Sequence, residues 1–164
     1  MLRLNRGLYV LTLAILVIAP TALFGQRVEL FGGYQYTHLQ PNFNASGWNA
    51  SVTGNFKHVL GITGDFSGAY KNNVDVHTYT FGPVLQARLP VVQPFVHALF
   101  GGMTISGSGS STTAFAMIIG GGLDIGFRRG LGFRLVQADW VSTRFADETQ
   151  NENFRGSAGI VIKF

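Results

Sequence analysis

The sequence predicts an all-β protein: a single eight-stranded antiparallel up-and-down barrel that crosses a membrane, preceded by a cleavable signal peptide. Three observations predict this fold class. Segments of about ten residues alternate between apolar and polar side chains, which is the length and pattern of a tilted membrane strand. Charged residues make up only 12% of the chain, about half their share in soluble domains. Aromatic residues, at 13%, gather near the ends of the alternating segments.

The first 25 residues are typical of a secretory signal peptide. Arg3 and Arg6 give a positive start, residues 8–19 form an apolar run, and Pro20 ends it. This run is shorter than the roughly 18 residues that a membrane-spanning helix needs. We therefore favour a cleaved signal over the alternative, a retained anchor helix. The chain is divided accordingly into a signal peptide, residues 1–25, and a barrel domain, residues 26–164.

Eight segments of the barrel domain alternate with a period of two, because successive side chains of a strand point to opposite faces. In the last one, Phe154, Ile160 and Phe164 share one face, while Arg155 and Lys163 share the other. An even number of antiparallel strands allows the last strand to close the barrel against the first. The predicted strands are residues 28–37, 48–57, 60–70, 76–86, 93–103, 114–126, 132–143 and 153–164.

The connections between these segments alternate between short and long. Short ones are predicted near residues 58–60, 87–91 and 127–131, and longer polar ones at 38–47, 71–75, 104–113 and 144–152. Bacterial barrels have short periplasmic turns and longer outer loops, so this pattern predicts that both termini are periplasmic. The Ser/Gly-rich loop 106–113 and the acidic loop 147–152 are then the expected contact surfaces for an extracellular ligand.

The aromatic residues provide an independent argument for a membrane. Tyr and Trp favour the membrane–water interface, because their rings are apolar and their tips form hydrogen bonds. On the predicted topology every Tyr and Trp of residues 26–164 falls at the outer end of a strand. These are Tyr34, Tyr36, Trp48, Tyr70, Tyr79 and Trp140. The alternative at the level of the fold is a soluble up-and-down barrel with an apolar pocket, which has no reason to sort its aromatic residues in this way.

The inward faces of the predicted strands are polar. The interior of an eight-stranded barrel is just filled by side chains, and a buried charge must be paired. Strand neighbours therefore suggest three ion pairs, direct or bridged by water: Glu29–Lys163, Asp139–Arg155 and Asp124–Arg134. The full set of candidate lumen charges is Glu29, Lys163, Asp139, Arg155, Asp124, Arg134, Asp65 and Lys57.

The pairing of the sixth and seventh segments creates a conflict of parity. Placing Asp124 opposite Arg134 turns Gln137 and Asp139 toward lipid, where a charge costs a few kcal/mol. A β-bulge between Leu135 and Gln137 shifts the parity by one residue and removes the conflict. We therefore predict such a bulge. The register used for this prediction pairs Leu123 with Leu135 and Ile125 with Phe133.

Several function classes lack support in the sequence. The chain has no cysteine, and residues 26–164 carry 10 Lys+Arg against 8 Asp+Glu, which gives no basic surface for nucleic acid. Neither glycine cluster, 107–109 or 120–122, precedes a helix as a phosphate loop would. No metal, cofactor or enzyme activity is therefore predicted. Residues Ser157, His97 and Asp139 could be assembled into a catalytic set only by chance, and the histidines His38, His58, His77 and His97 lie on different segments.

The chain resembles the small eight-stranded outer-membrane barrels of the OmpA-transmembrane-domain and OmpX type, the outer membrane protein beta-barrel domain family. The opening strand 28–37 and the closing strand 153–164 carry the resemblance, together with the signal sequence. Phe164, with Ile160 and Ile162 before it, is similar to the signal that the outer-membrane assembly machinery recognises. The resemblance implies a location in the bacterial outer membrane, with lipid and that machinery as partners.

Three function classes are open at this point. The first is a structural or surface-interaction barrel with polar extracellular loops and a closed, charge-paired lumen. The alternative is a narrow passive channel for small solutes or ions, since ion pairs can rearrange. An outer-membrane enzyme is a third class, for which the small lumen leaves little room.

Overall fold

The computed structural model describes residues 27–39, 43–56, 59–71, 74–107, 109–128, 130–145 and 148–164. The predicted signal peptide and Lys57 lie outside these residues. The strands are β1 (Arg27–Leu39), β2 (Phe43–Asn55), β3 (Leu60–Lys71), β4 (Val74–Gln86), β5 (Val92–Gly107), β6 (Ser110–Arg128), β7 (Leu131–Phe145) and β8 (Glu148–Lys163). All eight strands are predicted by the sequence, and most of them are longer than predicted. The described part of the chain contains no helix that could cross a membrane.

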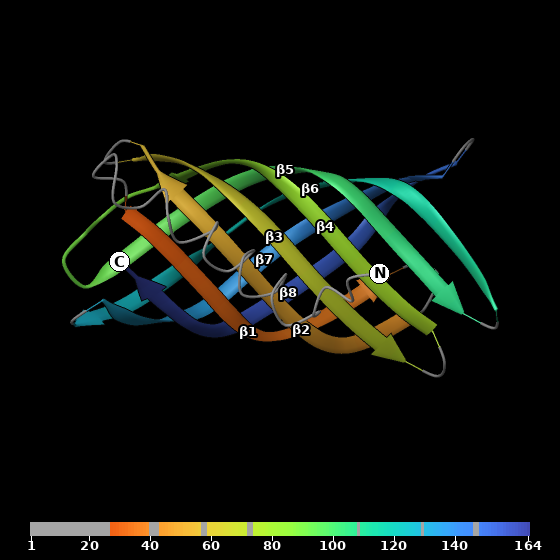
Figure 1. Cartoon of the computed structure of the whole chain (residues 1–164), viewed down its shortest axis with the longest axis horizontal. Coiled ribbons are helices and arrows are strands. Elements are labelled where there is room, and N and C mark those ends of the chain that lie inside the picture. The colour runs from red at the N-terminus through yellow and green to blue at the C-terminus, as the bar shows by residue number, and fades with distance from the viewer. Residues whose placement is uncertain are drawn as a thin grey trace, which may run out of the picture.

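The strands form a closed antiparallel barrel in sequence order, in which β8 pairs with β1 (Figure 1). Glu29 pairs with Lys163 and His38 with Phe154, so the seam runs along nearly the whole length of β1. The predicted all-β antiparallel barrel is therefore confirmed. We call the end where β1 begins and β8 finishes the terminal end. The hairpin end is the opposite one, where β1–β2, β3–β4, β5–β6 and β7–β8 are connected.

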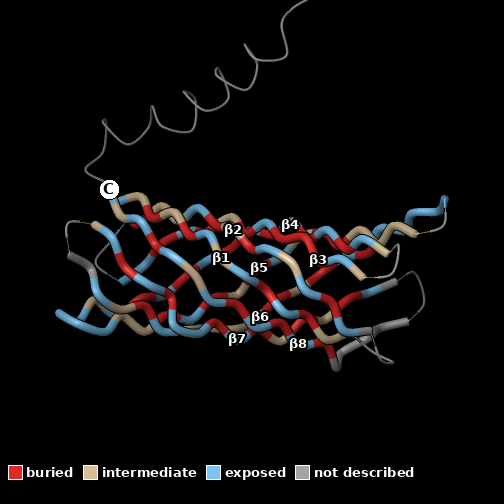
Figure 2. Tube along the Cα trace, turned by 90° about the horizontal axis from the view of Figure 1, so that it is seen from below, coloured by how far each residue is buried: buried red, intermediate tan, exposed pale blue. Residues whose placement is uncertain are grey.

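Exposed and buried residues alternate along the strands, as Figure 2 shows. In β8, Phe154, Ile160 and Ile162 are exposed, whereas Arg155 and Val161 are buried. The same alternation runs without interruption from residue 75 to residue 87 through β4. The outer wall is therefore apolar and the buried side chains point into the barrel, as the period-two pattern predicts.

Glycine allows neighbouring strands to approach closely where the wall curves. Gly33 has the same parity as the inward-facing residues of β1. A Cβ added to it would lie 2.2 Å from the carbonyl oxygen of Ala158 on β8. A Cβ on Gly32, the next residue, would meet nothing within 4 Å. Inward glycines of this kind let a sheet bend into a small barrel, so Gly33 is required by backbone geometry and Gly32 is not.

The predicted β-bulge in β7 is present. Leu123 pairs with Val136, and Asp124 pairs with Arg134, so that Leu135 is the additional residue. Leu135 and Val136 are consecutive and both are exposed, which shifts the parity of the rest of β7. The predicted pairing of Leu123 with Leu135 is wrong. The additional residue lies between the Asp124–Arg134 and Leu123–Val136 pairs, whereas the predicted register placed the bulge after a Leu123–Leu135 pair.

The long polar loops predicted at 38–47, 104–113 and 144–152 are wrong, because most of these residues extend the strands. The connections at the hairpin end are residues 40–42, 72–73, 108–109 and 146–147. The β5–β6 hairpin shows why: Thr104 and Thr113 face each other with their hydroxyl oxygens 3.0 Å apart, and Gly109 supplies the positive φ (85°) that a tight turn needs. Asp147 of the predicted acidic loop lies outside the described residues, and β8 begins at Glu148.

The six predicted girdle residues lie on the outer wall. Tyr34, Tyr36, Trp48, Tyr70 and Tyr79 are exposed, and Trp140 is half-buried. Trp48 Nε1 donates a hydrogen bond to Tyr70 Oη (3.2 Å), and both side chains lie over the space that a Cβ of Gly68 would occupy. Aromatic rings that cover a glycine of a neighbouring strand stabilise the sheet locally. The outer wall of β2 and β3 is therefore smooth and aromatic near the hairpin end.

Candidate functional site: the barrel interior

Arg155 of β8 is the centre of the polar interior. Its Nη1 lies 2.7 Å from Asp65 Oδ1 of β3, and its Nε donates to Asp139 Oδ2 of β7 at 2.8 Å. Arg155, Asp65 and Asp139 are all nearly fully buried. The guanidinium therefore joins three strands across the lumen, and each buried charge has an opposite charge within hydrogen-bond distance, as burial requires.

A chain of hydrogen bonds continues from Asp139 toward the terminal end. Gln137 Nε2 donates to Asp139 Oδ2 (2.7 Å), and Arg134 Nη1 donates to Gln137 Oε1 (2.7 Å). Arg134 then binds Asp124 through two nitrogens, Nε at 2.8 Å and Nη2 at 3.1 Å. This bidentate geometry is the strong form of an Arg–carboxylate pair. The β-bulge makes it compatible with inward-facing Gln137 and Asp139.

Two phenylalanines that the sequence analysis missed hold Arg134 in place. The guanidinium carbon lies 4.3 Å from the ring centroid of Phe31 and 4.1 Å from that of Phe95. Both rings are buried in the lumen. The parity of β1 was a sufficient signal for Phe31, because Glu29 and Gln35 lie on the same face. Phe95 lies in the predicted strand 93–103, where apolar residues occupy both faces and parity alone does not identify the inward one.

A second group of charges closes the terminal end around Glu29. Lys163 Nζ lies 3.2 Å from Glu29 Oε1, and Arg88 Nη2 lies 3.7 Å from the same oxygen. Asn55 Nδ2 also donates to it, at 3.1 Å. Arg88 belongs to the β4–β5 connection and was not predicted as a lumen residue, since connections carry no inward or outward parity.

The structure thus brings the predicted partners together in all three pairs, and it gives Asp65 a partner, Arg155, that the sequence did not specify. The described interior holds four carboxylates and four Lys or Arg cations within these ion pairs. We refer to these eight residues together with His97 and Gln137 as the charge network. Their formal charges cancel when His97 is neutral, which limits the electrostatic cost of burial.

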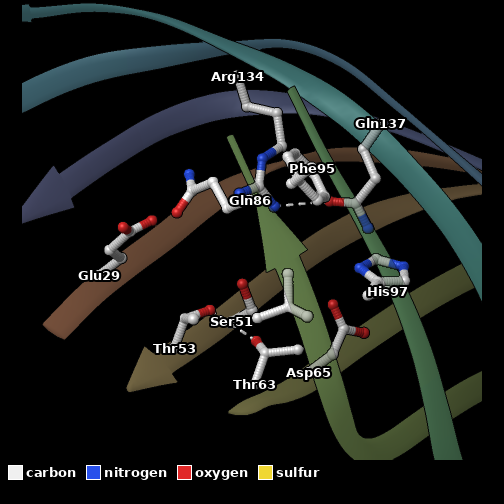
Figure 3. A pocket seen from close by; sticks show the side chains of 11 residues that line it. Glu29, Ser51, Thr53, Thr63, Asp65, Gln86, Phe95, His97, Arg134 and Gln137 are labelled. Carbon is white, nitrogen blue, oxygen red and sulfur yellow. Dashed lines mark hydrogen bonds between the residues drawn. The ribbon is translucent and has the colours of Figure 1, made fainter. Parts of the chain in front are cut away.

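The charge network leaves little free space. Figure 3 shows its cavity, with Glu29 and Gln86 on one side and His97 and Asp65 on the other. The free volume is about 10 Å³, which is room for roughly one water molecule. Several buried polar atoms around Arg155 make no hydrogen bond within the described protein, among them Asn49 Oδ1, Thr80 Oγ1 and Ser157 Oγ. Ordered water is the usual partner of such atoms.

The hairpin half of the interior contains an apolar cluster, which corrects the prediction of a polar inward face throughout. Inward residues of six strands, β2 to β7, pack together there, and Leu99, Ile118 and Val141 are at most 1% exposed. We call this group the apolar layer. Its members are Ala45, Ala69, Val76, Leu99, Met103, Ala116, Ile118 and Val141. Buried polar residues also face inward beside this layer: Thr78 of β4 pairs with Met103, and Thr143 of β7 pairs with Ala116.

The structure does not assemble the catalytic set weighed in the sequence. His97 Nε2 lies 2.9 Å from Asp139 Oδ1, but the hydroxyl of Ser157 has no hydrogen-bond partner in the described chain. A nucleophile needs a base within hydrogen-bond reach. Within the described ranges, no group of three or more His, Cys, Asp or Glu side chains could hold a metal ion. The position of His97 beside Arg155 and Gln137 fits a structural role in the charge network.

A barrel with an apolar wall, an aromatic outer belt and a paired polar interior has the architecture of the eight-stranded outer-membrane β-barrels, and solved structures of that class share its fold. Neisserial surface protein A matches 85% of this chain and 97% of its own, with a TM-score of 0.60 and 13% identity. The N-terminal β-barrel domain of Pseudomonas aeruginosa OprF matches 84% and 97%, with a TM-score of 0.61 and 13% identity.

A third structure of the same fold is Ail, the attachment invasion locus protein of Yersinia pestis, solved in complex with the heparin analogue sucrose octasulfate. It matches 85% of this chain and 99% of its own, with a TM-score of 0.54 and 18% identity. No protein-family model and no curated protein matches the sequence. At these identities the likeness establishes the fold alone.

Proposed function

We propose that this chain is a bacterial outer-membrane protein with a structural or surface-interaction role and a closed lumen. One observation carries the proposal: large apolar side chains such as Phe66, Phe81 and Phe133 are about half or more exposed, while charged side chains are buried and paired. In water, the charged side chains would be outside and the apolar ones inside. Lipid around the wall accounts for the exposed apolar side chains. A closed barrel is also stable in lipid, because every strand has its backbone groups paired.

The hairpin end is proposed to face the cell exterior, with both termini periplasmic. The lengths of the connections do not support this orientation, because those at the hairpin end have two or three residues. The polarity of the strand extensions supports it instead. Beyond Met103 and Ala114, the β5–β6 hairpin consists almost entirely of Thr, Ser and Gly, so it continues past the lipid-facing wall. Residues 1–25 are proposed as the export signal and Phe164 as part of the assembly signal.

The extended hairpins are the proposed contact surfaces for an extracellular ligand. Residues 110–113 of β6 are exposed and lie beyond the last β6–β7 pair, which joins Phe115 and Arg144. The Ail barrel, with the same fold, was crystallised with a sulfated sugar. The described tip of the β5–β6 hairpin carries no charge, so a ligand bound there would be recognised through hydroxyl and backbone hydrogen bonds.

Cysteine labelling on intact cells tests location and orientation together, because the native chain has no cysteine. We expect Ser110→Cys, at the hairpin end, to react with a membrane-impermeant maleimide on intact cells. Leu89→Cys, exposed in the β4–β5 connection, is the matched variant and is expected to react only after the outer membrane is permeabilised. The opposite order would contradict the orientation. Absence of both variants from the outer-membrane fraction would contradict the location.

A narrow passive channel is the second candidate, and the polar cavity of the terminal half favours it. The cavity reaches from Glu29 to His97 and is lined by hydroxyl groups of Ser51, Thr53 and Thr63. A conducting path would also have to pass the apolar layer. The expected result for the refolded barrel in a planar bilayer is no conductance, whereas discrete steps would support the channel.

A further inference from the structure

We propose that a groove on the outer wall, across β3 to β6, binds one acyl chain of an anionic phospholipid whose phosphate lies at the terminal rim beside Arg88. This inference goes beyond the proposed function and depends only on one part of it, the location of the barrel in a bilayer.

The groove consists of two adjoining hollows on the lipid-facing surface. The larger has a volume of about 600 Å³ and is lined by side chains of Leu60, Pro83, Leu85, Val96, Ala98 and Ile119. The smaller, about 240 Å³, is lined by Val59, Ala87 and Pro94 and also by Leu85 and Val96. The two hollows share Leu85 and Val96, so they adjoin, and we treat them together as one groove that extends from the terminal rim to the middle of the wall. Its volume is in the range of small-molecule sites, roughly 300–1,000 Å³.

Short side chains in the middle of the wall create the larger hollow. Pro83 of β4 and Ala98 of β5 lie between the paired residues Phe81–Phe100 and Val84–His97, where the ladder of the two strands is interrupted. Proline lacks the N–H that a ladder hydrogen bond requires. Long side chains surround the two short ones on the outer wall, all of them at least 41% exposed: Ile62, Phe81, Leu85, Val96, Phe100 and Ile119.

The lining decides the chemistry of the ligand. No charged side chain of the described residues lines either hollow, and the outward-facing side chains are aliphatic. The inward-facing residues His97 and Gly120 form part of the floor of the larger hollow. A flexible apolar chain fits such a groove, whereas a polar ligand would lose its hydrogen bonds to water without replacement.

A cation at the terminal rim of the barrel determines which lipid headgroup we expect beside the groove. Arg88 lies in the β4–β5 connection, next to Ala87 of the smaller hollow. Its side chain is 18% exposed, and it shares its carboxylate partner Glu29 with Lys163. A phosphate with its acyl chain in the groove would give Arg88 an anionic partner that it does not share, and guanidinium groups pair well with phosphate oxygens.

Native mass spectrometry of the folded barrel, after equilibration with mixed micelles of phosphatidylglycerol, tests the proposal. We expect the native barrel to retain one phosphatidylglycerol molecule. Ala98→Phe, which fills the groove, is expected to reduce the retained fraction at least tenfold. Ala158→Phe, on the exposed wall of β8, is the matched control and is expected to retain lipid as the native barrel does. Arg88→Gln is expected to reduce retention of phosphatidylglycerol and to leave retention of diacylglycerol unchanged.

Equal retention by Ala98→Phe and the native barrel would overturn the proposal, as would equal loss in Ala98→Phe and Ala158→Phe, which would indicate annular lipid. A heat-modifiable shift in gel mobility shows that each variant is folded. Should Ala98→Phe fail to fold, a photoreactive mid-chain phosphatidylglycerol can be crosslinked to the native barrel. Labelling concentrated on β4 and β5 is expected, and uniform labelling around the wall would overturn the proposal. Each outcome is independent of the cysteine-labelling result, which tests the location itself.

Discussion

The two halves of the barrel interior are closed by different interactions. The terminal half is filled by the charge network, in which Arg155 joins Asp65 and Asp139 across the lumen. The hairpin half contains the apolar layer, centred on Leu99 and Ile118. Ion pairs are directional and depend on every partner being present. Apolar packing has no such requirement, and its stability follows the volume that is filled.

This difference shows that inward parity and polarity are separate properties in a small barrel. Inward residues of β5 change from His97 to Leu99 and Met103 within one strand, without any change of parity. The outward face of β5 is apolar over the same stretch, while the interior changes from polar to apolar. A solute would have to cross both environments, and an apolar constriction resists the passage of ions even where it is wide enough to admit them.

The largest expected effect is found by comparing the loss of a cation of the charge network with the loss of a cation on the surface. Arg155→Met should lower the free energy of unfolding by about 3–5 kcal/mol, because it leaves Asp65 and Asp139 buried without their cation. Urea unfolding in vesicles, followed by Trp fluorescence, measures it. Arg144→Met, an exposed residue near the hairpin end, should change stability by less than about 0.5 kcal/mol. Similar losses in the two variants would refute the structural role of the network.

The next effect tests the apolar layer with two neighbouring residues of β6. Ile118 is 0% exposed and faces the layer, whereas Ile119 is 48% exposed and faces outward. Ile118→Ala should cost about 2–4 kcal/mol, because it leaves a cavity that the rigid wall cannot fill. Ile119→Ala should cost clearly less, because lipid replaces the missing methyl groups. The same unfolding assay applies, and a greater loss for Ile119→Ala would show that the assignment of inside and outside is reversed.

The smallest expected effect concerns the close approach of β1 and β8 at Gly33. Gly33→Ala should destabilise the barrel by about 1–3 kcal/mol, since its Cβ would lie 2.2 Å from a backbone oxygen of β8. Gly32→Ala should be neutral or slightly stabilising, because its Cβ meets nothing within 4 Å. Equal unfolding midpoints for the two variants would show that the seam between β1 and β8 can widen freely.

Much of the fold could be predicted because a barrel with an apolar outer wall and a polar interior imposes a strict parity on its strands. The alternation of β8 identified every described side chain from Asn153 to Phe164 as inward or outward in agreement with the structure. The conflict between Asp124, Arg134 and Asp139 was sufficient to predict the bulge in β7, since a charge on the lipid face is costly. These predictions depend on the difference between lipid and interior, which acts on each residue separately.

The remaining features depend on relations between distant residues, which parity does not contain. The ends of β5 and β6 could not be located, because Ser, Thr and Gly suit a loop as well as a solvent-exposed ladder. The pairing of Arg155 with Asp65 joins strands that are not neighbours in the barrel. The apolar layer combines single residues from six strands, and none of them is unusual in its own segment.

Single-channel conductance of Arg155→Ala, refolded without residues 1–25 in a planar bilayer, most directly tests the claim that the lumen is closed by two independent layers. A folded barrel is first verified by its heat-modifiable gel mobility. The apolar layer is intact in this variant, so we predict the same absence of conductance steps as in the native barrel. Discrete steps that appear only in Arg155→Ala would contradict the account, because the charge network alone would then be closing a channel.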